Sequence, residues 1–417
     1  MKSKLKNIMF IIILLVVLVL IISICYGVYK VISNSNVDDV DLPLDSNFKY
    51  NMIRQVNNDY KDTNYLISPY SIEVALSMVR EGAGSSTLEE LTDVVPKRKI
   101  EDIRIKNRIN VANALFIKNT YSNDIKIDYK NKMKKDYNSK LLIDKFETPK
   151  VINNWVNKET DKMIDKVIDE IDSDFVMGIA NALALDVEWK QSFECNRTYK
   201  EKFISNGKSF DVVMMNNSFR SEASYFDTQN EEGIILPYNY YNKKTGRVSN
   251  DEKSELEFIG IIPKSNISTY INSFDNNVLN NIINNKKEAS SDLTINLKLP
   301  RFSYSFDYSD FMDGLKEMGL NEMFNANADF SEISNMDLYI NKAVHKTYID
   351  LNEKGTKAAA VTYFSFTKNA IEIDENAVDI TFNKPFIYMI KYKDEIVFFG
   401  VVYEPEKWTN KTITCSK

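Results

Sequence analysis

A histidine base is available at only one position in this chain of 417 residues, His345, and a cysteine nucleophile at only three, Cys25, Cys195 and Cys415. Hydrolysis by a Ser-His-Asp or Cys-His arrangement requires a histidine base beside the nucleophile. His345 precedes the segment TYIDL at 347–351, which predicts a strand. We therefore interpret it as a core histidine satisfied by hydrogen bonds, and we expect the protein not to be an enzyme.

The sequence contains no evident metal site and no phosphate-binding loop. Cys195 and Cys415 lack the spacing partners of a zinc site, and the acidic residues around Asp374 lack the order of an EF-hand. The glycine-rich phosphate loops are missing as well, and a net charge of −6 argues against nucleic-acid binding. We expect no metal, no cofactor and no nucleic-acid partner, and at most one disulfide in the body of the chain.

Residues 350–367, DLNEKGTKAAAVTYFSFT, have the most unusual pattern. With a period of two from Thr356, one face carries small residues followed by Phe364 and Phe366, while the charge of Lys357 falls on the other face. The alanines at 358–360 also favour one helical turn by propensity alone. The segment could therefore lie outside a sheet as a loop or enter one as a strand, with little steric penalty in either state.

The N-terminal region predicts a membrane anchor. Residues 8–29 are apolar and uncharged, and they can cross a bilayer as a helix of about 20 residues. Lysines at positions 2, 4 and 6 favour a cytoplasmic N-terminus, residues 1–7, and place the rest of the chain outside the cytoplasm. The polar, acidic residues 30–46 predict a tether. The alternatives are secretion after cleavage of a signal peptide, and lipidation at Cys25.

The body of the chain opens with three predicted helices. The segment FKYNMIRQVNND at 48–59 predicts the first. Ser68 and Pro69, ahead of regularly spaced apolar residues, predict the start of the second. Ser86 and the acidic residues after it have the pattern of a capping box at the start of the third. We expect the body to form one large domain without an interdomain linker.

A series of motifs resembles the serpins, a family of protease inhibitors, in the family's order. The hinge of the serpin reactive-centre loop is similar to EKGTKAAA at 353–360, and the family signature is similar to residues 345–356. Further similar motifs are SPYSIEVALSMVREGAGSSTLEEL at 68–91, ANALF at 112–116, INNWV at 152–156, ANALAL at 180–185, LPRF at 299–302, NKPFI at 383–387 and FFGVV at 398–402. The resemblance therefore covers residues 47–405.

The resemblance implies an α+β serpin fold for residues 47–405 and a C-terminal tail at 406–417. The expected architecture is a large central mixed β-sheet, smaller sheets, about eight to nine helices and an exposed reactive-centre loop near the C-terminus. The implied function is inhibition of serine endopeptidases, or alternatively cysteine endopeptidases, by a monomeric suicide substrate whose cleaved loop inserts into the central sheet. The alternative is a serpin-fold carrier or surface interaction protein that does not inhibit.

The resemblance also assigns site residues. The hinge residues are Glu353, Gly355, Thr356, Ala358, Ala359 and Ala360. The shutter, a polar cluster under the middle of the central sheet, comprises Ser68, Ser71, Asn181 and His345. The breach, where insertion starts, contains Trp189 and Arg301, and we expect Arg301 to pair with Glu353. The family's spacing places the reactive bond at Asn369–Ala370, with cleavage after Lys368 as the alternative.

Three further features qualify this assignment. Lys357 stands where the family usually has glutamate, but it falls on the outer face and leaves the expectation of insertion unchanged. Basic residues between 97 and 108 could bind a polyanion, as in serpins that glycosaminoglycans activate, although the acids among them favour a solvated face. The polar stretch 242–254 predicts a lengthened hairpin loop.

Overall fold

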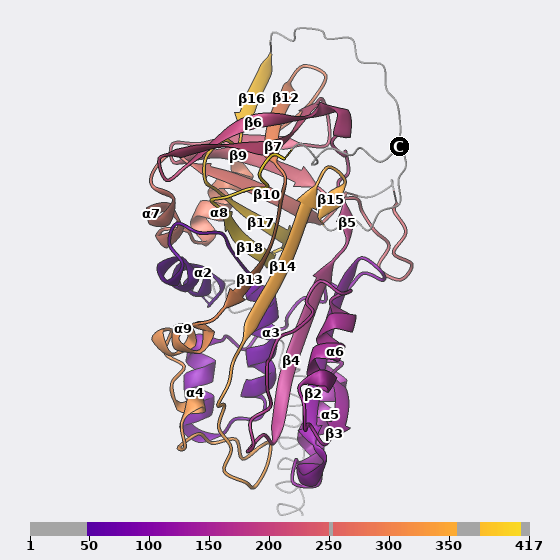
Figure 1. Ribbon diagram of the computed structural model, residues 1–417, viewed down its shortest axis with the longest axis vertical. Helices are drawn as coiled ribbons and strands as arrows, with labels where there is room; N and C mark the ends of the chain where they lie inside the picture. The colour runs from indigo at the N-terminus through magenta and orange to yellow at the C-terminus, as the bar shows by residue number, and fades with distance from the viewer. Residues whose placement is uncertain (1–47, 250–252, 357–375, 410–417) are drawn as a thin grey trace, which may run out of the picture. The chain divides into compact units, whose positions relative to one another are not determined.

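The computed structural model describes residues 48–249, 253–356 and 376–409 (Figure 1). Within these ranges the chain has the expected α+β fold, with eight α-helices and several β-sheets. The predicted anchor at 8–29, the tether at 30–46, the alanines at 358–360 and the predicted reactive bond, including Lys368, lie outside the described residues. No helix in the described ranges is long and apolar enough to cross a membrane.

The first helices begin where the sequence predicts. Helix α2 coincides with the segment 48–59, and Ser68 caps α3 by accepting a hydrogen bond from the Ser71 N–H at 3.1 Å, with Pro69 in the first turn. The helices are α2 (Phe48–Asp59), α3 (Pro69–Arg80), α4 (Ser85–Val94), α5 (Ile127–Asp136), α6 (Lys150–Glu159), α7 (Ile267–Asn272), α8 (Asn276–Asn284) and α9 (Phe311–Glu317). Three short 3-10 helices are η1 (Asn119–Tyr121), η2 (Cys195–Arg197) and η3 (Glu322–Phe324).

The predicted capping box at Ser86 is wrong. Helix α4 begins at Ser85, with Gly84 as the N-cap and no side-chain capping bond. The Ser86 hydroxyl instead donates to Glu322 Oε1 at 2.7 Å, and Glu90 Oε1 accepts the Glu322 N–H at 2.8 Å. Both contacts connect α4 to η3. The hydrogen bond of Ser86 to Glu322 replaces the local capping bond that the sequence predicts.

A seven-stranded antiparallel sheet holds much of the core. Its order is β1-β18-β17-β10-β9-β8-β11. The strands are β1 (Tyr65–Ile67), β8 (Ser224–Asp227), β9 (Glu231–Pro237), β10 (Leu256–Pro263), β11 (Lys287–Glu288), β17 (Phe386–Tyr392) and β18 (Glu395–Val402). Strands β10, β17 and β18 are buried along almost their whole length, which explains their nearly continuous apolar sequences.

A four-stranded sheet lies beside it in Figure 1, with the order β16-β12-β7-β6. Its strands are β6 (Thr198–Ser205), β7 (Lys208–Phe219), β12 (Thr294–Pro300) and β16 (Ala377–Thr381). The pair β12–β16 is parallel and the others are antiparallel. Strand β16 is the first described strand after the predicted loop, so the chain that follows the loop continues into this sheet.

The strands expected to form one large central sheet lie in two separate hydrogen-bonded sheets among the described residues, β3-β2-β4 and β13-β14-β15-β5, and these are called the two groups of the central sheet below. Its strands are β2 (Ile109–Lys118), β3 (Lys140–Asp144), β4 (Met177–Leu185), β5 (Val187–Glu188), β13 (Phe302–Tyr308), β14 (His345–Asn352) and β15 (Gly355–Thr356). Among the described strands, β4 pairs only with β2, whereas β14 pairs with β13 and β15. Strand β5 follows β4 after one residue, so the two groups meet only at the end where β15 lies (Figure 1).

Candidate functional site

The predicted hinge starts with a tight turn from β14 into β15. Asn352 Oδ1 accepts a hydrogen bond from the Lys354 N–H at 3.0 Å, which closes the turn. The chain then reverses, so that Gly355 lies opposite Asn352 and Thr356 lies opposite Leu351. Gly355 and Thr356 are both buried. The hinge therefore begins as a strand rather than as an exposed loop.

Strand β15 also pairs on its other side with β5, and this pairing explains the glycine. Gly355 lies opposite Glu188 and Thr356 lies opposite Val187. A Cβ atom at Gly355 would lie 2.0 Å from Val187 O, which leaves no space for any side chain. The hinge residues Gly355 and Thr356 are thus held between β14 and β5, and both are buried.

Trp189 connects the turn to the hinge. Its Nε1 donates a hydrogen bond to Asn352 O at 3.0 Å, and its indole stacks on the ring of Tyr238 with centroids 4.6 Å apart. The Tyr238 hydroxyl lies 2.6 Å from Thr356 Oγ1. Burial raises the pKa of Tyr238, so this hydroxyl keeps its proton. Thr356 is therefore fixed by a specific polar contact as well as by its backbone.

Glu353, in the turn, is buried and has two partners. Its Oε1 lies 2.5 Å from Arg301 Nη2 and accepts a hydrogen bond from Thr198 Oγ1 at 2.8 Å. A buried carboxylate requires such partners, because its desolvation is otherwise too costly. The Phe193 N–H also donates to Glu353 O at 2.9 Å. These contacts attach the turn to the start of β6 and to the loop before it.

The four predicted shutter residues form two groups, both linked to α3. On the β14 side, the Ser68 N–H donates to His345 Nε2 at 3.1 Å. On the β4 side, Ser71 Oγ donates to Asn181 Oδ1, and Asn181 Nδ2 donates to Asn113 Oδ1 at 2.7 Å. Among the described residues, no hydrogen bond joins Asn181 directly to His345. The predicted shutter is thus split in the same way as the central sheet: Asn181 lies with the β4 group and His345 with the β14 group.

His345 is neutral in this environment. Burial lowers its pKa to about 4, and its Nε2 accepts a backbone hydrogen bond and therefore carries no proton. The ring lies 5.6 Å from that of Phe311, centroid to centroid. Because the lone pair of Nε2 is occupied by the Ser68 N–H, His345 is not placed to activate a nucleophile.

Lowering the pH is expected to destabilise the fold through His345. The unfolded chain binds this proton near pH 6.5, whereas the folded chain binds it only near pH 4, so the unfolding free energy falls as the pH drops between these values. A difference of about 2.5 pKa units corresponds to roughly 3 kcal/mol. Urea denaturation of the wild type and of His345→Asn, whose amide oxygen can accept the same N–H, should show a stability difference that shrinks over this pH range. A difference that stays constant would contradict the assignment.

A cavity of about 460 Å³ separates β4 from β14. Residues 174–183 and 337–348 line its two sides, and further lining comes from Leu76 on α3, Phe311 on α9 and Ile164 after α6. A smaller hollow, lined by Leu183, Ile349 and Thr356 among others, continues the gap to the hinge. Among the described residues, the edge of β4 that faces this space has no strand partner, and the facing edge of β14 is paired only at Leu351 and Asn352, with β15.

Three residues at this site are absent from the sequence-based assignment. Asn113 is a polar residue within the apolar run 111–117 of strand β2, and that position indicates a buried hydrogen-bond partner. Thr198 and Tyr238 give no comparable signal, because a threonine at the start of a strand and a tyrosine after one are common anywhere. Their roles depend on contacts between segments far apart in the chain.

The three arginines between 97 and 108 pair with carboxylates of the protein. Arg98 bridges Glu73 and Glu395 at 2.7 and 2.5 Å, Arg104 pairs with Asp102 at 2.6 Å, and Arg108 pairs with Glu188 at 3.4 Å. Lys97, Lys99 and Lys106 are exposed. The three arginines are thus engaged within the protein, which weakens the polyanion-binding interpretation.

Metal-binding and cysteine chemistry do not contribute to the described site. Within the described ranges, no group of three or more His, Cys, Asp or Glu side chains is arranged to hold a metal ion. Cys195, in η2, is disulfide-bonded, and the other two cysteines lie outside the described residues. One disulfide is what the cysteine count allows for the body of the chain.

Comparison with known proteins identifies the fold. The family model described as "Serpin (serine protease inhibitor)" matches residues 44–405. The chain belongs to the serpin family. This serpin is similar to an uncharacterised serpin-like protein of Methanosarcina mazei, with 29% identity over 386 residues that cover 85% of this chain and 84% of that protein.

Two further similarities extend over most of the chain. A protein of Cyanea capillata named "Serine protease inhibitor" is 26% identical over 375 residues, which cover 82% of this chain and 93% of that protein. The crystal structure of the thermophilic serpin tengpin in its native state is 28% identical, with a TM-score of 0.72, and the match covers 88% of this serpin and 95% of tengpin. The serpin fold therefore accounts for nearly all of the described residues.

Proposed function

We propose that this serpin is an extracytoplasmic inhibitor of serine endopeptidases, with cysteine endopeptidases as the alternative target class. The protease attacks a bond in the reactive-centre loop and forms an acyl-enzyme. The cut loop then enters the central sheet as a new strand and carries the protease with it. The similarity to a Cyanea capillata protein named as a serine protease inhibitor supports this proposal.

The observation that carries the proposal is the position of β15. Gly355 and Thr356 lie between β14 and β5, and the space beyond Thr356 is a hollow that leads into the larger cavity. A chain continuing from Thr356 in the same direction would meet the unpaired edges of β4 and β14. Both edges offer backbone donors and acceptors to an added strand, so the site is suited to receive the loop.

Insertion would release enough free energy to arrest the protease. The new strand gains backbone hydrogen bonds on two sides, and Phe364 and Phe366, which share the phase of Thr356, would gain roughly 1.5–3 kcal/mol each when fully buried. Loss of one oxyanion-hole donor slows a protease about 10²–10³-fold. A protease whose active site is distorted when the inserting loop carries it along would therefore fail to hydrolyse the acyl-enzyme.

The reactive bond proposed from the spacing to Glu353 is Asn369–Ala370. Cleavage after Lys368 is the alternative, and it would suit a protease with a trypsin-like pocket. The first residue of the released C-terminal peptide distinguishes the two bonds, because it is Ala370 in the first case and Asn369 in the second.

Mixing residues 35–417 with a panel of serine and cysteine proteases tests the proposed function. An inhibitor gives a complex that survives SDS, together with a released C-terminal peptide that mass spectrometry can identify. A carrier or a surface interaction protein gives cleavage without a complex. Cleavage without any complex across the whole panel would therefore support the non-inhibitory alternative.

The proposed location is the outer face of a membrane, through the apolar residues 8–29. This proposal rests on the sequence of a region outside the described residues. The full chain should stay in the membrane pellet after an alkaline carbonate wash, whereas the chain from residue 35 onward should not. Recovery of the full chain in the medium with a shortened N-terminus would support secretion instead.

A further inference from the structure

Strand β5, the partner of the hinge, is held on its other side by the hairpin 238–249. The Glu188 N–H donates to the Tyr241 hydroxyl at 2.7 Å, and Glu188 O accepts from the Asn239 N–H at 2.8 Å. Because the N–H and C=O of one strand residue point to the same side, those of the next residue point to the opposite side. Accordingly, the Trp189 N–H donates to Lys354 O at 2.9 Å, in the turn before the hinge. The hairpin thus fixes the strand against which the hinge lies.

Arg108 joins the same strand to the same hairpin. Its Nη1 lies 3.4 Å from Glu188 Oε1, and its guanidinium carbon lies 4.7 Å from the centre of the Tyr241 ring. Its Nε also donates to Gly246 O at 3.4 Å, near the tip of the hairpin. One side chain therefore contacts β5, the base of the hairpin and the tip of the hairpin.

The hairpin tip packs directly against residues 105–108. Gly246 has a φ of +68°, and a Cβ atom there would lie 2.0 Å from Lys106 O, so glycine is required on both grounds. The Lys106 N–H also donates to Lys243 O at 3.1 Å. Residues 242–249 of the predicted lengthened loop thus form a hairpin tip with a close backbone contact to residue 106.

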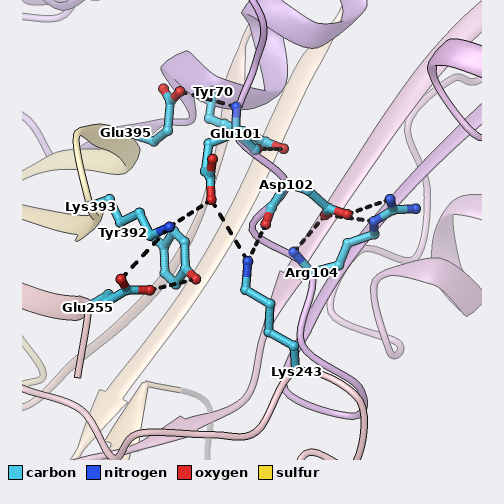
Figure 2. Close-up of polar contacts among 9 residues, drawn as sticks. All are labelled: Tyr70, Glu101, Asp102, Arg104, Lys243, Glu255, Tyr392, Lys393 and Glu395. Atoms are coloured by element: carbon cyan, nitrogen blue, oxygen red, sulfur yellow. Dashed lines mark hydrogen bonds and ion pairs between the residues drawn. The ribbon is translucent and has the colours of Figure 1, made fainter. Parts of the chain in front are cut away.

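Residues 101–104 form a fixed base for the hairpin, as Figure 2 shows. Lys243 Nζ donates to Asp102 O at 2.8 Å and lies 3.8 Å from Glu101 Oε1. Glu101 Oε1 also pairs with Lys393 at 3.0 Å, on the β17–β18 turn, and Glu101 O accepts from the Tyr70 hydroxyl at 3.0 Å. The hairpin is therefore connected through this base to α3 and to the seven-stranded sheet.

We propose that the hairpin 238–249 is a hinge latch. In this arrangement Arg108 and Tyr241 are positioning residues: they hold β5 in place, and β5 in turn keeps Gly355 and Thr356 in the sheet. Loosening the latch lets these two residues leave the sheet more often, which makes the start of insertion less efficient. The effect on insertion rests on the proposed inhibitory function, whereas the effect on how often Gly355 and Thr356 leave the sheet does not.

Hydrogen exchange of the intact, full-length protein tests the latch without any protease. Tyr241→Phe removes only the hydroxyl that accepts the Glu188 N–H, and Arg108→Met removes the cation but keeps much of the side-chain bulk. In the double variant, amides in peptides covering residues 353–356 should exchange at least about tenfold faster, as expected when two polar contacts are lost. The single variant Arg108→Lys retains a cation near Glu188, so exchange of the hinge amides in this variant should stay within about threefold of the wild type.

Arg54→Met is the matched control. It removes an arginine of α2 whose hydrogen bonds go to Asn51, Asn272 and Phe274, none of which lies in β5, in the hairpin or in residues 101–104. Hinge exchange in this control should stay within about twofold of the wild type. Unchanged hinge exchange in the double variant would overturn the latch. An equal rise of exchange in hinge peptides and in peptides from β17 and β18 would also overturn it, because it would indicate a global loss of stability.

The inhibitory consequence has a separate readout. The double variant should consume at least about twice as many molecules per protease molecule inhibited, because more loops are hydrolysed before insertion begins. Faster hinge exchange without any inhibition, in wild type or variant, would leave the latch in place and overturn only the proposed function. Faster hinge exchange with an unchanged inhibitor-to-protease ratio would overturn the link between the latch and insertion.

Discussion

Replacing Thr356 with arginine is expected to convert this serpin from an inhibitor into a substrate. Thr356 is buried, faces inward and lies 2.6 Å from the Tyr238 hydroxyl, so an arginine there would place an unpaired charge in the core. A cost of about 3 kcal/mol in the insertion step lowers its rate about 100-fold. The fraction of protease trapped in an SDS-resistant complex should fall accordingly, while loop cleavage continues.

Two conservative variants at the same position serve as controls. Thr356→Ser keeps the hydroxyl that contacts Tyr238 and should inhibit almost as well as the wild type. Thr356→Val removes that contact without adding charge, so it should cost only about 1–3 kcal/mol through the unpaired Tyr238 hydroxyl. Full inhibition by Thr356→Arg would show that Thr356 does not have to remain inside the sheet, and the insertion mechanism would then be wrong.

Cutting the loop near Asn369 without trapping a protease is expected to raise the melting temperature by about 15–20 °C. A strand formed by residues 357–369 would add about ten backbone hydrogen bonds at about 1 kcal/mol each, besides the burial of two phenylalanines. For a domain of this size, the entropy of unfolding implies a shift in the melting temperature of about 1.3 °C for each kcal/mol. Calorimetry of the intact and the cut ectodomain measures the change directly.

The cut form of Thr356→Arg is the control for this measurement. Its loop should be severed at the same bond but fail to insert, so its melting temperature should stay close to that of the uncut variant. If the wild type and the variant respond equally to the cut, the gain does not come from strand insertion. If neither gains stability, the native protein stores no free energy for trapping a protease.

Much of the fold could be predicted from local patterns. The helix at 48–59 and the start of α3 at Pro69 follow from apolar spacing and from turn chemistry that involves neighbouring residues. The serpin fold itself was implied by motifs spread over the whole body, and the family model matches residues 44–405. Local signals were misleading at Ser86, where partners more than 200 positions away replaced the expected capping bond.

The candidate site could be predicted only in part. The positions of Gly355 and Thr356 in the motif indicated a hinge, but the sequence contains no sign that β5 would hold them from the other side. The division of the central sheet and the cavity inside it depend on which strand edges remain unpaired, and no single segment encodes that property. The contacts of Arg108 likewise required the packing of a hairpin that begins 130 positions later in the chain, at Tyr238.

The close fit of Gly355 against Val187 has a consequence for the kinetics of trapping. A strand that joins a sheet must normally find its register, and a slip by one residue would turn Lys357 inward and the alanine face outward. In this serpin, only glycine fits opposite Glu188, so the alignment is already chosen while the loop is whole. If a cut loop inserts as proposed, it therefore needs no search for its register and can add to the sheet residue by residue from this fixed end.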